Sequence, residues 1–124
     1  MQVALAQMKV EGGQPESNRA RACRRIEQAA SLGVDLVLLP EALDFGWTHP
    51  SAQDAAGAIP GGETFETLSQ AAKKNGLFVC AGLVELHGKH LFNSAVLIGR
   101  EGELLLLHRK INELEIAHDL YSLG

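Results

Sequence analysis

A short aliphatic run constrains the fold of this chain more than any other segment. Residues 35–39 are aliphatic apart from Asp35, and Pro40 and Glu41 follow directly. A continuous apolar run of this length is typical of a strand that is buried on both faces, as in parallel sheets covered by helices. We therefore expect a strand here that carries the carboxylate of Glu41 at its end.

Further strands and helices alternate around this run, which predicts an α/β fold. The apolar patterns and turn signals place strands at 3–8, 77–86, 90–98 and 103–108, and helices from about Ser17 to Ser31 and from about Glu63 to Asn75. Ser17 is expected to cap the first helix, and Gly33 to end it. Residues 42–62 are predicted to form a long loop, of a length that is often functional, and residues 111–124 a loop or short helix.

The charge of the chain argues against binding to nucleic acid. The formal net charge is −4, and no basic run exceeds two residues. Such a chain is a poor candidate for binding nucleic acid. The four arginines between Arg19 and Arg25 are bracketed by Glu16 and Glu27, so they are predicted to form a solvated helix face.

The sequence also predicts a cytoplasmic protein without a membrane segment. No apolar stretch reaches the roughly 18–20 residues of a transmembrane helix. The chain opens directly into its first predicted strand, which leaves no room for a signal peptide. Cys23 and Cys80 have no CxxC spacing, so a disulfide framework is not expected.

A second strand-like run ends in a lysine. Four consecutive leucines, residues 104–107, are followed by His108, Arg109 and Lys110. An acid at the end of one buried strand and a lysine at the end of another are expected to converge in a cleft. A carboxylate can act there as a base and an ammonium can stabilise a developing oxyanion. No cysteine follows Lys110, so the sequence supplies half of a nucleophilic site.

Short motifs occur in order along the whole chain. They are Val3-Ala4-Leu5-Ala6-Gln7, Asn18, Ala29-Ala30, residues 33–37, Leu39-Pro40-Glu41, Gly46-Trp47, Gly82-Leu83-Val84-Glu85, Phe92-Asn93-Ser94-Ala95, residues 99–102 and Arg109-Lys110-Ile111. Each motif is weak alone. In this order and spacing, they resemble the nitrilase superfamily of carbon–nitrogen hydrolases.

The resemblance implies a fold and a reaction. The fold is an α-β-β-α sandwich of the nitrilase type, of which this chain supplies about half, with residues 1–124 as the N-terminal part of the hydrolase domain. The implied site is a Glu-Lys-Cys triad that hydrolyses an amide, nitrile or carbamoyl group without a cofactor. By position, Glu41 is the general base and Lys110 the oxyanion donor. The family's cysteine lies beyond the lysine, and hence beyond residue 124.

Other residues have weaker assignments. Cys23 and Cys80 are expected to be packing residues. Glu113 and Glu115 both lie where many family members carry a second glutamate that supports the lysine, and the sequence does not choose between them. Trp47 either lines the substrate pocket or folds back onto the sheet. Asn93 is expected to satisfy buried backbone groups. No metal site is predicted, because His87 and His90 straddle a turn without further ligands.

Half a sandwich would leave an apolar sheet face uncovered, beyond what soluble monomers usually tolerate. We therefore expect that the natural chain continues past Gly124 or that a partner covers the face. The complete protein is expected to be a hydrolase of small amides or nitriles, with homo-oligomers as the form in solution. Residues 1–124 alone are expected to be inactive and prone to associate. The alternatives are a non-catalytic or truncated relative that binds a partner, and an unrelated α/β interaction module.

Overall fold

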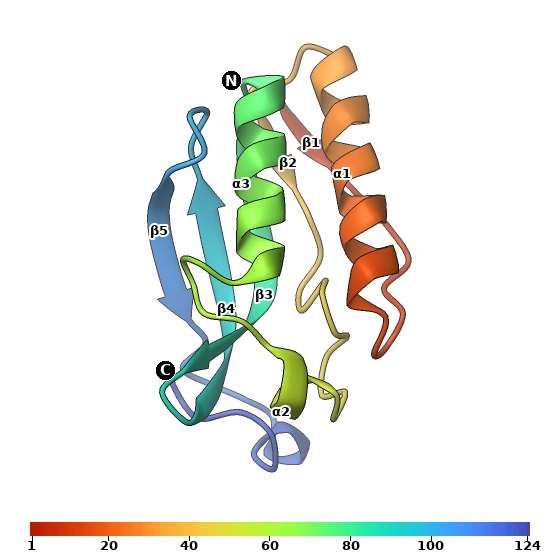
Figure 1. The fold of residues 1–124 in the computed structure, drawn as a ribbon. Coiled ribbons are helices and arrows are strands. Elements are labelled where there is room, and N and C mark those ends of the chain that lie inside the picture. Colours follow the sequence, from red (N-terminus) through yellow and green to blue (C-terminus); the bar gives the residue numbers. More distant parts are fainter.

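A five-stranded mixed sheet forms one layer of the molecule, and two long helices form the other (Figure 1). The computed structural model describes residues 1–124. The strands are β1 (Val3–Leu5), β2 (Leu36–Leu38), β3 (Phe78–His87), β4 (His90–Ile98) and β5 (Leu104–Arg109), adjacent in this order. Strands β1, β2 and β3 run parallel, whereas β3, β4 and β5 pair antiparallel. The two layers are half of the expected four-layer sandwich.

Helix α1 (Pro15–Ser31) begins differently from the prediction. Gln14 precedes the helix and makes no side-chain capping bond, and Pro15 occupies the first helical position. Proline suits that position because its φ is already helical. It lacks an N–H, but the N–H at the first helical position makes no hydrogen bond within the helix. The prediction that Ser17 caps the helix is wrong, since Ser17 lies in the first turn. Gly33 follows the helix as predicted, with a φ of 70° that glycine adopts without strain.

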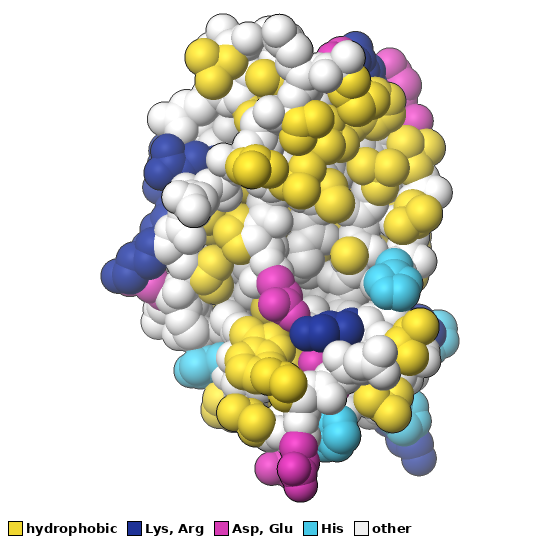
Figure 2. Space-filling view, turned by 180° about the vertical axis from the view of Figure 1, so that it is seen from behind, with side chains coloured by type: hydrophobic (Ala, Val, Ile, Leu, Met, Phe, Trp, Pro, Cys, Tyr) yellow, Lys and Arg dark blue, Asp and Glu magenta, His cyan; other side chains and the backbone are white.

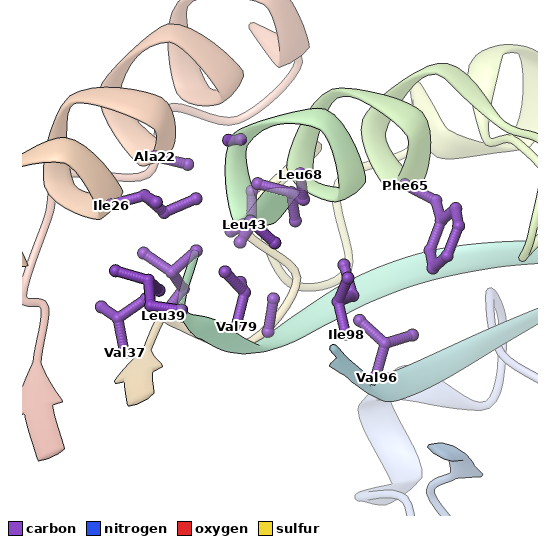
Figure 3. Close-up of a cluster of buried hydrophobic side chains, with 14 of the residues drawn as sticks. Ala22, Ile26, Val37, Leu39, Leu43, Phe65, Leu68, Val79, Val96 and Ile98 are labelled. Carbon is purple, nitrogen blue, oxygen red and sulfur yellow. The ribbon is translucent and has the colours of Figure 1, made fainter. Parts of the chain in front are cut away.

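Helix α3 (Glu63–Asn75) has the predicted bounds, and Gly76 ends it in the left-handed conformation. The two helices pack against each other and cover one face of the sheet. Figure 3 shows the core between the layers, where Ile26 of α1 and Leu68 of α3 face the sheet. Both side chains are fully buried, as is Val37 of β2. None of the helices combines the length and apolar composition needed to cross a membrane.

The opposite face of the sheet has no helical cover. One row of residues in register crosses all five strands on that face: Leu5, Leu38, Cys80, Leu97 and Leu106. Leu5 is 75% exposed, Leu38 37% and Leu106 55%. The expectation that residues 35–39 are buried on both faces is therefore wrong for this chain, because only the Val37 face is covered. Figure 2 shows hydrophobic side chains spread over much of this side of the molecule.

The segment from 42 to 62 is more ordered than a simple loop. It contains a short helix, α2 (Ala52–Ala55). Leu43 is fully buried in the main core, and Phe45 is buried in a second cluster beneath the ends of β3 and β4. The tail from 111 onward contains one 3-10 turn, η1 (Glu115–Ala117), as the prediction of a loop or short helix allows. Both segments pack around the end of the sheet at which β2 and β5 end.

Candidate active site

Glu41 lies just beyond β2, at the point where the chain turns across β3. Leu39 N–H donates to the carbonyl of Cys80, Gly82 N–H donates to the carbonyl of Pro40, and Leu43 N–H donates to the carbonyl of Gly82. These bonds attach the chain to β3 on both sides of Glu41. The Glu41 side chain is 52% exposed.

Lys110 follows β5 and points toward Glu41. Its backbone N–H donates to the carbonyl of Asn93 at 2.9 Å, which continues the pairing of β4 and β5 by one residue. Its ammonium Nζ donates to Glu41 Oε1 at 3.0 Å. The structure thus brings together the two residues that the sequence singled out, 69 positions apart. Figure 2 shows an acidic and a basic side chain in contact at one end of the uncovered face.

Asn93 is the third member of this cluster. Its side-chain amide Nδ2 donates to Glu41 Oε1 at 2.6 Å. The expectation that Asn93 satisfies backbone groups is therefore wrong for its side chain. Glu41 Oε1 accepts both hydrogen bonds, and Oε2 accepts none from this chain. The signal in the sequence was an amide within a largely apolar strand, but its partner depends on the tertiary fold.

Glu41 and Lys110 each stabilise the charged form of the other. The amide of Asn93 is the main cause that lowers the pKa of Glu41, and the Lys110 ammonium also lowers it, while partial burial opposes both. The hydrogen bond to Glu41 is the main cause that raises the pKa of Lys110. At neutral pH the site therefore holds a carboxylate and an ammonium.

Glu113 lies on the other side of the lysine. Its carboxylate is 3.5 Å from Lys110 Nζ, and its side chain is fully buried. Neither carboxylate oxygen makes a hydrogen bond within the chain, so the ion pair is its only compensation. Glu115 is exposed at the start of η1. Of the two glutamates left open by the sequence, the structure puts Glu113 against the lysine.

A pocket of about 310 Å³ lies beside the cluster on the uncovered face. Its walls are formed by Leu38, Leu39, Glu41, Cys80, Ala81, Gly82, Asn93, Ser94, Ala95, His108 and Lys110. Cys80, expected to be a packing residue, therefore also lies on the pocket wall. Its pKa is raised by burial, which disfavours the thiolate that a nucleophile needs.

Trp47 does not line this pocket. Its ring packs against the second hydrophobic cluster, which includes Phe45 and Tyr121. The indole Nε1 is buried without a hydrogen-bond partner. Within residues 1–124, Trp47 thus packs against the second cluster and is not on the wall of this pocket.

A buried ion pair supports the end of β5 from the helical side of the sheet. Glu85 on β3 is 1% exposed and accepts two hydrogen bonds from the Arg109 guanidinium, at 2.7 and 2.9 Å. Ser94 Oγ donates to the same carboxylate. Each of these two partners is a chain neighbour of a site residue, since Arg109 precedes Lys110 and Ser94 follows Asn93. The ion pair thus fixes the backbone from which both side chains project.

Comparison with known proteins places this chain in a family. The family model for carbon-nitrogen hydrolases matches residues 2–119. A nitrilase of Pyrococcus abyssi is 35% identical over 115 residues, which are 90% of this chain and 44% of the relative. An omega-amidase of Xenopus tropicalis is 39% identical over 101 residues, 80% of this chain and 36% of the relative. The chain thus spans less than half the length of these curated relatives.

Solved structures show the same fold at lower identity. An amidase from Nesterenkonia sp. superposes with a TM-score of 0.89 at 21% identity, covering 100% of this chain and 48% of that one. A carbon-nitrogen hydrolase superfamily protein from Xanthomonas campestris gives 0.88 at 23% identity, covering 99% and 46%. By its sequence match along nearly its whole length, this chain belongs to the carbon-nitrogen hydrolase family.

Proposed function

We propose that the protein containing this chain hydrolyses a carbon–nitrogen bond of a small amide or nitrile. Glu41 acts as the general base, and Lys110 stabilises the oxyanion. A cysteine from sequence beyond residue 124 is the nucleophile. One observation carries this proposal: Glu41 Oε1 is engaged by Asn93 and Lys110, and Oε2 is left free beside a pocket.

The free oxygen defines a direction for proton transfer. Glu41 Oε2 takes the proton of the thiol as sulfur attacks the amide carbon. The tetrahedral oxyanion is stabilised by the Lys110 ammonium, and the proton on Glu41 passes to the leaving nitrogen. Ammonia departs and a thioester remains. Water then adds with Glu41 again as base, the carboxylic acid is released, and the thiol regains its proton.

Lys110 suits an electrostatic role because two carboxylates neighbour it. Glu41 and Glu113 both raise its pKa, so it remains an ammonium throughout the neutral range. A preorganised cation that needs no reorientation during the reaction is the usual form of oxyanion stabilisation. A single such donor typically contributes about 3–4 kcal/mol of transition-state stabilisation.

Neither cysteine of this chain is a good nucleophile. Cys23 packs against the main core from α1. Burial raises the pKa of Cys80, and no cation of the chain lowers it. In the amidase from Nesterenkonia sp. AN1, acrylamide has reacted by Michael addition at an active site cysteine. These points favour a cysteine outside residues 1–124.

The relatives suggest the substrate class and the apolar face suggests assembly. Similar proteins include a nitrilase and omega-amidases, which supports a small amide or nitrile as substrate. The exposed leucines at 5, 38 and 106 support burial of this sheet face in the whole protein and association of its copies.

Trapping the covalent intermediate tests the proposed reaction. The full-length natural protein is acid-quenched during turnover of propionamide, digested, and mapped by mass spectrometry. We expect a propionyl group on a cysteine outside residues 1–124. A propionyl group on Cys80 would place the nucleophile on β3 and overturn this assignment. Turnover of propionamide without any cysteine adduct would argue against covalent catalysis.

A further inference from the structure

Gly82 lies where the backbone of Glu41 crosses β3. Its N–H donates to the carbonyl of Pro40 at 3.1 Å, and its carbonyl accepts from the N–H of Leu43 at 2.9 Å. One residue of β3 therefore binds the chain on both sides of the intervening pair, Glu41 and Ala42. Ala42 has a φ of 46°, which shows how sharply the chain bends there.

The contact between the two backbones leaves no room for a side chain. A Cβ atom built on Gly82 would lie 2.5 Å from the Cα of Glu41, 3.0 Å from the N of Ala42 and 3.2 Å from the C of Glu41. Carbon atoms in ordinary contact are about 3.5–4.0 Å apart. All three atoms belong to the backbone, so no side-chain rotation relieves the overlap.

The conformation of Gly82 itself does not require glycine. Its φ is not in the left-handed region, unlike that of seven other glycines in the chain. Glycine in the interior of a strand weakens the strand, and it often marks a place where another backbone approaches closely. The absent side chain at this position is thus explained by the crossing backbone at Glu41 and Ala42.

We propose that Gly82 is a positioning residue that sets where the base Glu41 stands relative to Asn93 and Lys110. The expected effect of Gly82 on turnover rests on the proposed function. Its expected effect on the position of Glu41 rests on the geometry alone. A methyl group at position 82 forces the Glu41 backbone outward by about 1 Å. The two hydrogen bonds to Glu41 Oε1, at 2.6 and 3.0 Å, then lengthen or break.

The test replaces Gly82 by alanine in the full-length natural protein. Gly99→Ala is the matched control, because the atoms nearest to its Cβ would be those of the flexible Glu103 carboxylate, in a turn at the far end of β4 from the site. Ammonia release from propionamide gives kcat and KM. A ¹³C titration of the Glu41 carboxyl, assigned with Glu41→Gln, reports its pKa without any need for turnover.

We expect Gly82→Ala to lower kcat about 100-fold, as for a misplacement of about 1 Å, with KM changed less than about threefold. We also expect the pKa of Glu41 to rise, because its bonds to Asn93 and Lys110 lower it in the native chain. Gly99→Ala should leave both quantities unchanged. If the natural protein releases no ammonia, the proposed reaction fails, and the Glu41 titration still decides the role of Gly82.

A second variant covers the case in which Gly82→Ala does not fold. Adding Ala42→Gly frees the turn to move away from the new methyl group, because glycine accepts many more backbone conformations. We expect the double variant to fold with Glu41 displaced, its kcat still low and its pKa still raised. Native kcat and native Glu41 titration in either folded variant, the single Gly82→Ala or the double, would overturn the proposal.

Discussion

Glu41 uses a single carboxylate oxygen, Oε1, for the ammonium of Lys110, 3.0 Å away. The same oxygen also accepts from Asn93, so the second oxygen remains free to take a proton. In a symmetric bidentate pair each oxygen would already accept one hydrogen bond, and neither would be free of contacts. The geometry thus separates the two tasks of the carboxylate, holding the lysine and accepting the proton.

Removing the lysine should slow acylation without unfolding the protein. We expect Lys110→Ala to lower the single-turnover acylation rate by about 10²–10³, the usual loss for one oxyanion donor. Lys110→Arg should fail as well, because a planar guanidinium does not replace a compact ammonium. Lys89→Ala, in the exposed β3–β4 turn, is the control. Full activity of the arginine variant would mean that the site needs only diffuse positive charge.

Removing the Asn93 amide should shift the pH profile of the reaction. Its hydrogen bond is the main cause of the lowered pKa of Glu41. Asn93→Ala should therefore raise that pKa, and the acidic limb of kcat/KM should move to higher pH. Asn75→Ala, which removes an amide that bonds the Ala71 carbonyl at the end of α3 and lies outside the pocket, is the matched control. An unchanged acidic limb with the alanine variant folded would contradict the assigned contact.

The two glutamates after the lysine should differ in their effects. Glu113 lies 3.5 Å from Lys110 Nζ and raises its pKa, whereas Glu115 is exposed. Glu113→Gln should lower the pKa of Lys110 and move the alkaline limb of kcat/KM to lower pH. Glu115→Gln should leave the profile unchanged. Equal effects of the two variants would show that the ion pair to Glu113 has no special role.

Buried Asp44 should make stability depend on pH. Burial raises its pKa to about 6, against hydrogen bonds from the backbone N–H groups of Val84 and Phe45. The folded state favours the protonated form of Asp44. Its contribution to the free energy of unfolding is therefore largest below about pH 4. Its contribution then declines until about pH 6, by up to about 3 kcal/mol.

Asp44→Asn removes this titration. The free energy of unfolding of the variant, measured in urea between about pH 4 and 7, should therefore fall less with rising pH than that of the parent. Asp54→Asn, at an exposed aspartate of α2, should follow the parent curve. Parallel curves for the parent and Asp44→Asn would show that Asp44 titrates normally in the folded chain.

Local patterns predicted most of the helices and strands. The bounds of α3 followed from its apolar spacing, and β3 and β4 from their apolar patterns and turn signals. The start of α1 was missed because Pro15 at the first helical position outweighed Ser17 as a cap. Within residues 1–124 only one face of β2 is covered, because an apolar pattern describes the strand and not what covers it.

The site was only half predictable for a different reason. Glu41 and Lys110 are each marked by the strand that precedes them. The bond from Asn93 to Glu41 joins residues 52 positions apart and depends on the register of β3 with β4. The choice of Glu113 over Glu115 depends on the path of an irregular tail. The place of Gly82 beneath Glu41 likewise follows only from the packing of two backbones.

Ammonia release from small amides tests the central claim most directly, with the full-length natural protein compared with its Glu41→Gln variant. The substitution keeps the shape of the side chain and its place in the site, and it removes the charge and the basicity of Oε2. We expect steady release by the natural protein, and release lowered by at least about 10³-fold in the variant, with unchanged circular dichroism. Release by Glu41→Gln within about tenfold of the natural protein would contradict the assignment of Glu41 as the base.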